Sequence, residues 1–451
     1  MLLRGITVNA LGDYYADNPA LPTVEALSEA DFAQIAALGF DAVRLVVSWS
    51  KLEPERGRVD PVELARVHQV VSWAGAHRLY VVIDMHQDAW GKTIATPPGV
   101  TCPPGSSPAI GWDGAPAWAT LTEAQSTCRG GVRELSPAVE KAWVSFYNDT
   151  DGIQAELVST WKVIAASFAD DPAVAGYDLM NEPHFGLRVD GAQLGPLSRY
   201  YAAALAAVRA GEQQRSGGFA HLVFFEPMVT WFLVGAGAVP PAWSSDPGIV
   251  YAPHLYAGSL SDGAPDPMAT IRAGFSEAAR EASVYQTPWW SGEWGWFDDP
   301  ATDGPLVAAY ARDEDAALVG GAWWDWQQSC GDPHQIATPG APPRPVSDGL
   351  IRLACPSGRT LGSPAEFTKV LSRPYPRASA GRLTSLSADP MTVTADISGT
   401  VATTGTVELW VPGDQRPTVT GATGSDMART DGGWDVTADV AAGAYHLHVG
   451  A

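Results

Sequence analysis

The sequence predicts an α/β protein, a (β/α)8 barrel of the TIM type followed by a small C-terminal β-sandwich domain. The chain has 451 residues, more than a single domain usually holds. Up to about Arg373, short apolar runs alternate with longer helical patterns, whereas the remaining chain shows the period-two alternation of antiparallel strands. Hydrophobic residues make up 46% and charged residues 17%, which is typical of a soluble protein with a sizeable core.

The apolar runs of the first part are nearly continuous, as expected for strands that a parallel sheet buries on both faces. A doubly wound sheet is the alternative, but no glycine-rich phosphate-binding turn follows the first run. We expect strands at Leu3–Val8, Ala42–Val47, Tyr80–Asp84, Gly176–Met180, Leu222–Glu226, Ile249–Ala252, Trp289–Gly292 and Gly320–Trp324.

Helical patterns fill the intervals between these runs. The first is predicted over Ser28–Leu38, because Ser28 and Asp31 have the spacing of a capping box and Gly39 is a typical helix end. Further helices are predicted at Pro61–Ala76, Gln154–Phe168, Leu197–Arg209 and Leu306–Leu318. Strands and helices in this alternation favour a closed barrel.

One segment, Ala89–Val144, is predicted to be a long loop rich in Gly, Pro and Trp. Loops of such length in a compact domain are usually lids or binding loops. The segment follows the third strand, so in a barrel it lies at the carboxyl ends of the strands, where active sites form. We therefore expect it to cover part of a binding site.

The character of the sequence changes after Pro374. Aromatic residues become rare, and Thr, Val and Gly alternate between Gly/Asp turns in the runs Met391–Ile397, Thr406–Val411 and Tyr445–Val449. We predict a barrel domain over residues 1–375 and a β-sandwich domain over residues 376–451. The shortage of aromatic side chains favours a structural role for the second domain over sugar binding.

The net charge of -22 indicates which partners are unfavourable. A nucleic acid would be repelled, because its binding depends on cationic contacts to phosphate. The same field opposes docking onto anionic membranes, and no stretch is long and apolar enough to predict a membrane-spanning helix. We expect a monomer with no nucleic-acid partner and no stable membrane insertion.

The four cysteines form two pairs that are close in sequence, Cys102 with Cys128 and Cys330 with Cys355. Both pairs lie in loops rich in Pro and Gly, where a crosslink restrains the chain, so we predict two disulfides and a secreted protein. The first residues resemble the start of a strand rather than a signal peptide, which implies that a leader is missing from this sequence. Four free thiols in a cytoplasmic protein are the alternative.

Carboxylates follow two of the predicted strands. The fourth strand runs into Asn181-Glu182-Pro183, and the seventh runs into Glu293. A carboxylate at the end of a buried strand is either paired with a cation or used in chemistry. Two of them at one end of a barrel suit glycoside hydrolysis, in which one protonates the leaving oxygen and the other attacks the anomeric carbon.

Three other polar residues are predicted to support these carboxylates. Arg44 lies inside an apolar strand, and we expect it to hold Glu293 ionised, with a structural ion pair elsewhere in the barrel as the alternative. Asn181 has an amide that could bind a sugar 2-hydroxyl, or it could simply form a turn. Tyr256 is predicted to donate a hydrogen bond to Glu293, with plain packing as the alternative.

The third and sixth strands end in His86-Gln87-Asp88 and His254-Leu255-Tyr256. Without close Cys/His or His-x-His spacing, these histidines predict hydrogen-bonding groups rather than metal ligands, and we expect no metal and no cofactor. At the eighth strand, Trp323 and Trp324 point in opposite directions because side chains alternate. The one that faces the barrel interior would form a sugar platform.

Together these residues resemble glycoside hydrolase family 5, a family of retaining (β/α)8 glycosidases. The resemblance runs from Arg4 to about Trp326 and implies that Glu182 is the acid/base, Glu293 the nucleophile and Trp324 the sugar platform. The residues that carry it, each at the strand end where the family places it, are Arg44, His86, Asn181, Glu182, Pro183, His254, Tyr256, Glu293 and Trp324.

Within that family, Asp84–Asp88, Gly114–Trp118 and an added C-terminal sandwich resemble the endoglycoceramidase branch. The resemblance implies that Asp88 contacts the sugar in the first subsite and that the substrate is a glycolipid, such as an oligosaccharide β-linked to ceramide. Relatives near the branch cleave steryl glucosides and flavonoid rutinosides. The first-strand loop, Asn9–Tyr15, lacks the lysine that some endoglycoceramidases use to hold the sugar, so glycan and aglycone both stay open.

We therefore expect a retaining β-glycosidase that uses double displacement and releases an apolar aglycone. The two carboxyl groups should lie about 5 Å apart, and burial and the charge of Glu293 should raise the pKa of Glu182. The apolar segment Phe224–Met228, with Trp231 and Phe232, favours a hydrophobic leaving group. The alternatives are an endoglucanase with an open aromatic groove and a non-catalytic carbohydrate- or lipid-binding barrel.

Overall fold

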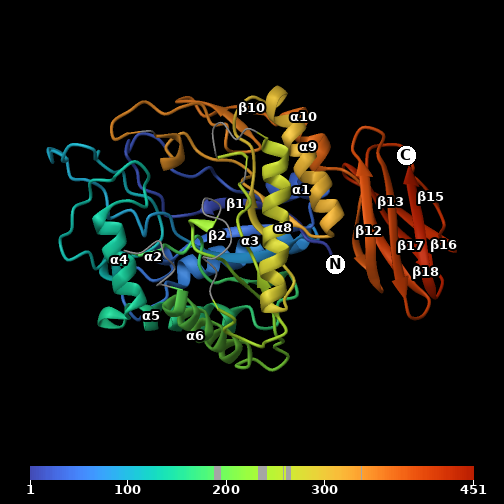
Figure 1. Cartoon of the computed structure of the whole chain (residues 1–451), viewed down its shortest axis with the longest axis horizontal. Coiled ribbons are helices and arrows are strands. Elements are labelled where there is room, and N and C mark those ends of the chain that lie inside the picture. Colours follow the sequence, from blue (N-terminus) through green and yellow to red (C-terminus); the bar gives the residue numbers. More distant parts are fainter. Residues whose placement is uncertain (187–193, 232–240, 257, 261–265, 337, 451) are drawn as a thin grey trace.

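The fold is described from a computed structural model that covers residues 1–186, 194–231, 241–256, 258–260, 266–336 and 338–450. Its centre is a curled parallel sheet with the strand order β6-β5-β4-β3-β2-β1-β8-β7. A parallel bridge between Tyr251 and Trp289 links β6 to the residues just before β7, so the two ends of the sheet meet. This arrangement, with helices around it, is consistent with a (β/α)8 barrel (Figure 1).

The parallel strands lie where the apolar runs predict them, with ends that differ by a few residues. Every residue of β1 and β2 is buried, which explains why these strands carry no polar alternation. The strands are β1 (Arg4–Leu11), β2 (Ala42–Ser48), β3 (Tyr80–His86), β4 (Val174–Asp178), β5 (Leu222–Phe225), β6 (Ile249–Tyr251), β7 (Ser291–Trp294) and β8 (Gly321–Trp323).

The predicted helices are also present, and Ser28 and Asp31 form the expected capping box. One prediction was wrong: the segment Ala89–Val144 is not a loop throughout, because a helix begins at Pro137 and buries its Trp143 face against the barrel. The helices are α1 (Glu29–Ala37), α2 (Trp49–Leu52), α3 (Pro61–Ala76), α4 (Pro137–Tyr147), α5 (Ile153–Ser167), α6 (Leu194–Glu212), α8 (Pro267–Tyr285), α9 (Pro300–Ala317) and α10 (Ala365–Leu371). Among the described residues, no helix combines the length and apolar character needed to cross a membrane.

Both predicted disulfides are confirmed. Cys102 and Cys128 close the loop between β3 and α4, and Cys330 and Cys355 close the segment that follows β8. This second segment also holds a short hairpin of β9 (Arg352–Ala354) and β10 (Arg359–Gly362). Each disulfide therefore restrains a long excursion on the carboxyl side of the barrel strands.

The Cys102–Cys128 disulfide should affect the loop more than the barrel. We expect that replacing both cysteines by serine speeds backbone hydrogen exchange over residues 95–135, because the crosslink removes loop freedom worth about 3 kcal/mol. The barrel strands should keep their protection, since the loop contributes little to the sheet. Hydrogen exchange read by mass spectrometry checks this, and equal acceleration throughout the barrel would contradict it.

The C-terminal part consists of two four-stranded antiparallel sheets, with the orders β11-β14-β17-β16 and β12-β13-β18-β15. Both sheets contribute to one buried apolar cluster that includes Ile397, Leu409, Val436 and Leu447. The strands are β11 (Tyr375–Ser379), β12 (Arg382–Asp389), β13 (Thr394–Val401), β14 (Gly405–Pro412), β15 (Thr418–Thr420), β16 (Gly424–Thr430), β17 (Gly433–Val440) and β18 (Gly443–Gly450).

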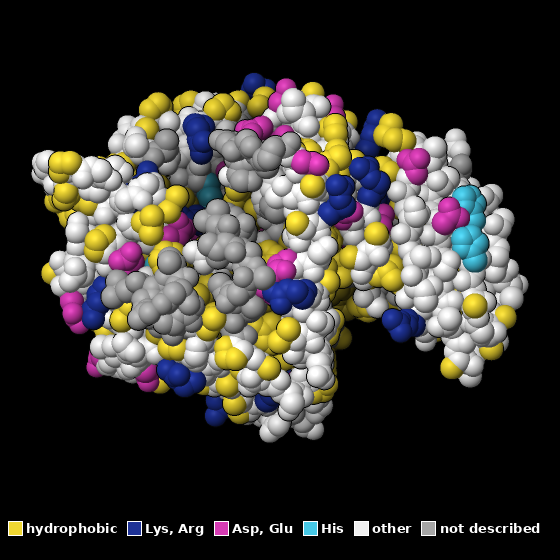
Figure 2. All heavy atoms as spheres, viewed as in Figure 1, with side chains coloured by type: hydrophobic (Ala, Val, Ile, Leu, Met, Phe, Trp, Pro, Cys, Tyr) yellow, Lys and Arg dark blue, Asp and Glu magenta, His cyan; other side chains and the backbone are white. Residues whose placement is uncertain are grey.

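These sheets adjoin the end of the barrel at which the parallel strands begin. The backbone N–H of Leu2 donates to Arg377, and the Tyr375 hydroxyl donates to the carbonyl of Gly39, which precedes β2. Arg78, just before β3, forms an ion pair with Asp435. In Figure 1 the chain start lies beside these sheets, and Figure 2 shows a hollow that separates the lower parts of the two units. The carboxyl ends of the parallel strands therefore face away from the C-terminal sheets.

Candidate active site

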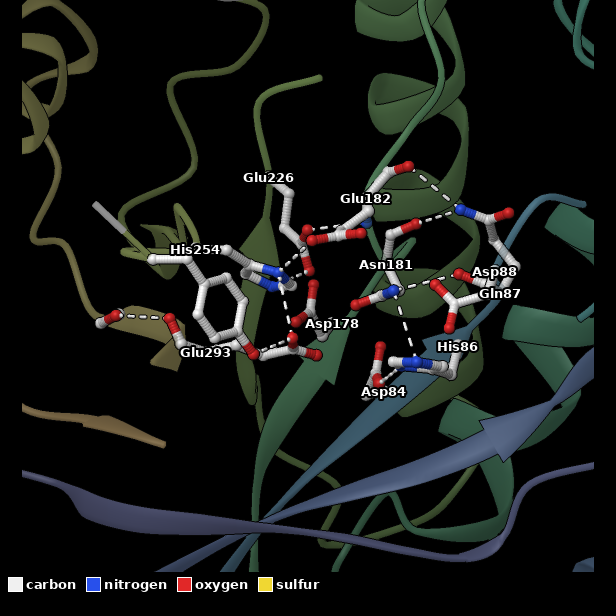
Figure 3. Close-up of polar contacts among 12 residues, drawn as sticks. Asp84, His86, Gln87, Asp88, Asp178, Asn181, Glu182, Glu226, His254 and Glu293 are labelled. Carbon is white, nitrogen blue, oxygen red and sulfur yellow. Dashed lines mark hydrogen bonds and ion pairs between the residues drawn. The ribbon is translucent and has the colours of Figure 1, made fainter. Parts of the chain in front are cut away.

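The structure brings the residues predicted for the site together at the carboxyl ends of the barrel strands. Figure 3 labels six of them: His86, Asp88, Asn181, Glu182, His254 and Glu293. The side chains come from β2 and β3, from the residues that follow β3, β4, β6 and β8, and from β7 itself. All but one of them are buried, Glu182 being partly exposed. They are Arg44, His86, Asp88, Asn181, Glu182, His254, Tyr256, Glu293 and Trp324.

The carboxylates of Glu182 and Glu293 face each other across His254. The His254 Nδ1 atom lies 3.0 Å from Glu182 Oε1 and 3.3 Å from Glu293 Oε2. A carboxylate oxygen of Glu182 and a carboxylate oxygen of Glu293 lie within 4.8 Å of each other. Retaining glycosidases place their carboxyl groups about 5–5.5 Å apart, whereas inverting enzymes need a gap of about 6.5–9.5 Å for water. The geometry therefore suits direct attack by one carboxylate on an anomeric carbon.

Arg44 lies at the centre of a group of carboxylates. Its Nη1 atom is 2.6 Å from Glu293 Oε1, and its Nη2 atom donates to Asn181 Oδ1 at 3.0 Å. Burial lowers the pKa of this guanidinium, but nearby carboxylates outweigh burial and raise the pKa well above its usual value. The cation thus stays charged and fixes both Glu293 and the Asn181 amide. Its remaining carboxylate partners are Asp84, Asp178 and Glu226, each 3.0 Å away.

Glu293 has a donor at each carboxylate oxygen. Arg44 holds Oε1, and the Tyr256 hydroxyl donates to Oε2 at 2.8 Å. Burial raises the pKa of Glu293 above its usual value, and the positive charges of His254 and Arg44 offset only part of that effect. Ionisation of this buried carboxyl therefore depends on the two cations that contact it.

Glu182 is held by its backbone as well as its side chain. Its φ of 40° lies in the left-handed region, which non-glycine residues seldom adopt. The backbone N–H of Glu182 donates to Glu226 Oε2 at 2.8 Å, and Gln87 Nε2 donates to the carbonyls of Asn181 and Glu182. These bonds direct the carboxyl group toward Glu293.

The pKa of Glu182 differs from the prediction. Burial does raise it, but the hydrogen bond from His254 and the charges of His254 and Arg133 outweigh burial, so the pKa lies below its usual value. His254 is itself protonated, because Glu226 and Glu293 hold its pKa well above the usual value despite burial. That two cations converge on Glu182 could not be predicted from the local sequence around it.

His86, Asn181 and Trp324 form one wall of the site. His86 Nδ1 contacts Asp84 at 2.7 Å, and the His86 ring stacks on Trp324 with centroids 5.4 Å apart. Burial lowers the pKa of His86, but Asp84 outweighs it and raises the pKa to about 9. Trp324 packs with Val46 on the inner side, whereas Trp323 packs on the outer side of the sheet. Trp324 is thus the tryptophan that reaches the site.

Asp88 is contacted by two residues that the sequence analysis did not identify. Arg133 Nη2 lies 2.6 Å from Asp88 Oδ1, and His334 Nε2 lies 3.4 Å from Asp88 Oδ2. Burial raises the pKa of Asp88, but Arg133 and His334 outweigh it and hold the pKa well below its usual range. Arg133 comes from the connection between β3 and α4, and His334 from the segment after β8. No local pattern in the sequence therefore predicts that both side chains contact Asp88.

Glu226 is a further carboxylate of the site, beside Glu182 and Glu293, and it was not among the predicted site residues. It follows β5, its Oε1 atom contacts Arg44 and His254, and its Oε2 atom accepts from the backbone of Glu182. The sequence pattern could have identified Glu226 as a site residue, because it directly follows an apolar strand, as the predicted site carboxylates also stand at strand ends. Through these contacts Glu226 positions the backbone of Glu182, and its own carboxylate is buried rather than exposed to a substrate.

Among the described residues, three groups have donor spacing that could hold a metal ion. A guanidinium already contacts each group: Arg44 lies 3.0 Å from three carboxylates and 2.6 Å from Glu293, and Arg133 lies 2.6 Å from Asp88. A metal ion would be repelled by these fixed charges. The groups are His86/Asp88/Asp113, Glu182/His254/Glu293 and Asp84/Asp178/Glu226.

A small cavity of about 10 Å³, roughly enough for one water molecule, lies beside Glu182. Glu182, Glu226 and His254 form its polar wall, and the segment 227–231 after β5 forms the rest. The apolar lining residues of that segment are Pro227, Met228, Val229 and Trp231. Phe232, which the sequence analysis placed on the same side, lies outside the described residues.

Several known endoglycoceramidases are similar to this chain in sequence. Endoglycoceramidase I of Rhodococcus hoagii (strain 103S) is 28% identical to this chain over 267 residues, which are 56% of this chain and 50% of that protein. An endoglycoceramidase of Cyanea nozakii is 27% identical over 262 residues, 49% of this chain and 48% of that protein. The chain thus spans about half the length of the curated relatives it matches.

Solved structures match over almost the whole chain. A crystal structure of an endogalactoceramidase has a TM-score of 0.90 and 42% identity, with 99% of this chain and 95% of that chain covered. The lactosyl-enzyme intermediate of endo-glycoceramidase II from Rhodococcus sp. has a TM-score of 0.76 and 26% identity, with 100% and 97% covered.

The family comparison covers the barrel and the residues around the paired carboxylates. The model of cellulase, glycosyl hydrolase family 5, matches residues 19–329, more than half of the chain. Those residues include Arg44, Asn181, Glu182, Tyr256 and Glu293. On the evidence of this match and of the relatives above, the chain belongs to glycosyl hydrolase family 5.

Proposed function

We propose that this protein is a retaining β-glycosidase that cleaves the bond between a sugar and the lipid part of a glycolipid. The observation that carries the proposal is the pair of carboxylates, Glu182 and Glu293, which have oxygens within 4.8 Å of each other at the carboxyl ends of the barrel strands. In that arrangement Glu293 can attack the anomeric carbon while Glu182 protonates the leaving oxygen.

In the first step, Glu293 attacks the anomeric carbon and the bond to the aglycone oxygen breaks. Glu182 gives its proton to that oxygen, so the aglycone leaves as a neutral alcohol. Arg44 and Tyr256 hold the attacking carboxylate, and Asn181 can bind the sugar 2-hydroxyl. The product of this step is a sugar ester of Glu293.

In the second step, water replaces the aglycone. Glu182, now ionised, takes a proton from the water, whose oxygen attacks the anomeric carbon and breaks the ester to Glu293. The negative charge of Glu293 disappears while it is esterified, which lowers the pKa of Glu182 and favours its action as a base. Two inversions give a product with retained configuration.

The substrate class follows from the leaving-group side. The segment after β5 places apolar side chains beside Glu182, namely Pro227, Met228, Val229 and Trp231, which suits a lipid leaving group better than a second sugar. The endogalactoceramidase that is 42% identical to this chain supports a β-galactosyl ceramide link as the bond cleaved. We propose galactose as the sugar next to the lipid, and ceramide as the aglycone.

A panel of glycosides tests this proposal. We expect release of free ceramide from galactosylceramide, slower cleavage of glucosylceramide and lactosylceramide, and the least cleavage of cello-oligosaccharides, steryl glucosides and flavonoid rutinosides. Both products should be identified by mass spectrometry, and NMR of the first-formed sugar should show the β-anomer. Preference for cello-oligosaccharides would indicate an endoglucanase instead of a glycolipid-cleaving enzyme. If no glycoside is cleaved, the proposal that the protein is a glycosidase is refuted.

We also propose that the barrel of residues 1–375 is the catalytic domain and that residues 376–451 form a β-sandwich with a supporting role. The apolar cluster shared by the two C-terminal sheets supports a sandwich. The two disulfides support export of the protein to an oxidising compartment, where it acts as a monomer.

A further inference from the structure

Arg133 is the charged residue of the site that neither fold nor family position explains. It lies in the connection between β3 and α4, five residues beyond the Cys102–Cys128 disulfide, and its side chain is only 21% exposed. Its Nη2 atom lies 2.6 Å from Asp88 Oδ1 and 3.2 Å from Glu182 Oε2. One guanidinium nitrogen thus joins the predicted sugar-binding carboxylate to the predicted acid/base.

The rest of the Arg133 side chain is also fixed. Its Nε atom donates to Glu134 Oε1 at 2.6 Å, and its guanidinium lies 4.4 Å from the centre of the Trp112 ring. The Trp112 ring contacts His334, which in turn lies beside Asp88. A side chain with this many partners has a defined position rather than a choice of surface rotamers.

The charged groups that face Glu182 come from several elements. His254, after β6, and Arg133, from the loop after β3, are the cations. Glu226 after β5, Glu293 on β7 and Asp88 after β3 are the anions. Of the two cations, His254 contacts both Glu182 and Glu293, whereas Arg133 pairs with Glu182 and Asp88. Arg133 therefore acts on one catalytic carboxylate and not on the other.

We propose that Arg133 is a positioning residue that holds Glu182 in its ionised form for the second step of the reaction. The inference rests on the proposed function, because it assigns Glu182 to both steps. During attack by water, the aglycone has left, Arg133 can contact Glu182 as it does in the free site, and the carboxylate must accept a proton. During the first step the same contact opposes protonation of Glu182, so Arg133 has opposite effects on the two steps.

The signs of these effects are fixed by electrostatics. The positive charge of Arg133 lowers the pKa of Glu182, so its removal raises that pKa. A higher pKa keeps the acid protonated to higher pH, which extends the first step toward alkaline pH. The same change leaves less ionised base at low pH, which slows the second step. A residue with a purely structural role would slow both steps and move neither pH limit.

The test compares Arg133→Met with Arg133→Lys, which keeps the charge, and with Arg58→Met, which removes an exposed arginine that pairs with Glu55. Galactosylceramide reports the first step through kcat/KM, because its alkoxide must be protonated to leave. The compound 2,4-dinitrophenyl β-galactoside reports the second step through kcat, since its leaving group needs no acid. Both substrates are measured between pH 4 and pH 9, with thermal melting as a check on folding.

For Arg133→Met we expect the alkaline limit of kcat/KM on galactosylceramide to move up by about one pH unit. On the dinitrophenyl glycoside we expect kcat to fall by up to about threefold at pH 5 and by more at pH 4, with a burst of dinitrophenol equal to the enzyme present. The Arg133→Lys variant should lie between Arg133→Met and the wild type, and Arg58→Met should match the wild type.

Unchanged pH limits in an active, folded Arg133→Met variant would overturn the inference and leave the proposed function intact. An equal loss on both substrates, with no burst and no shift, would also overturn it, since that result indicates a structural role. If Arg133→Met does not fold, the comparison is made between Arg133→Lys and the wild type, where a weaker contact should give a smaller shift of the same sign. A wild-type chain that cleaves neither substrate would instead refute the proposed function itself.

Discussion

Replacing Glu293 by alanine is expected to reduce turnover of galactosylceramide on the order of 10⁵-fold or more, comparable with the loss of the nucleophile in other covalent hydrolases. The reason is structural: Arg44 and Tyr256 hold the two oxygens of this carboxylate, and no other carboxylate of the described residues occupies an equivalent position. Initial rates of ceramide release by mass spectrometry measure the effect.

The matching control is Glu55→Ala, which removes an exposed glutamate paired only with Arg58 on the surface. It should keep wild-type activity. Because Arg44 would lose one of its partners in Glu293→Ala, thermal melting must show that the variant folds. A folded Glu293→Ala variant that retains more than about a hundredth of the activity would contradict the role of Glu293.

Replacing Glu182 by alanine should remove the proton donor while leaving the nucleophile in place. We expect about a 10²–10⁴-fold loss on galactosylceramide, which needs acid assistance, and a much smaller loss in the first step on 2,4-dinitrophenyl β-galactoside. Added azide should restore turnover of the aryl glycoside, because the small anion can enter the space left by the side chain and attack the ester without a base.

The configuration of the azide product decides between the two glutamates. Attack on the sugar ester of Glu293 gives a β-glycosyl azide, and NMR distinguishes it from the α-anomer. Glu293→Ala should form no ester and should give no β-azide under the same conditions. Formation of the β-azide by Glu293→Ala and not by Glu182→Ala would reverse the two assignments.

Much of the fold could be predicted because the barrel strands are buried on both faces and so leave a strong apolar signal. Helix α3 (Pro61–Ala76) has the predicted ends, because Asp60 caps it and Pro61 fits the first turn. The start of α4 at Pro137 was missed, since the Gly, Pro and Trp content before it is typical of a loop. The apolar face of α4 that includes Trp143 can be recognised as a helix face only once the barrel against which it packs is known.

The site was predictable where each residue ends its own strand. Glu182, Glu293 and Arg44 belong to that class, and the structure places them in contact through His254 and Asn181. Residues delivered by long loops were not predictable in the same way. Their distance from the active centre along the chain contains no information about their distance in space until the loops are folded.

Arg133 and His334 are the clearest examples. They lie 201 positions apart in the sequence, on loops after β3 and β8, and both reach Asp88. The lowered pKa of Glu182 could not be predicted for the same reason, because Arg133 contributes to it. Cations on the long loops therefore lower the pKa values of the carboxylates at the strand ends, and the strand residues alone do not predict this effect.

The attachment of the C-terminal sheets to the starting ends of the strands has a practical consequence. The glycolipid substrate proposed above would present its headgroup from a surface, so the carboxyl ends of the barrel strands would have to approach that surface without obstruction. Contacts of Leu2 with Arg377 and of Tyr375 with Gly39 keep the added sheets on the opposite pole of the molecule. A reporter or an immobilising tag fused behind residue 451 would therefore orient the enzyme with these strand ends outward, free to work on vesicles or cell surfaces.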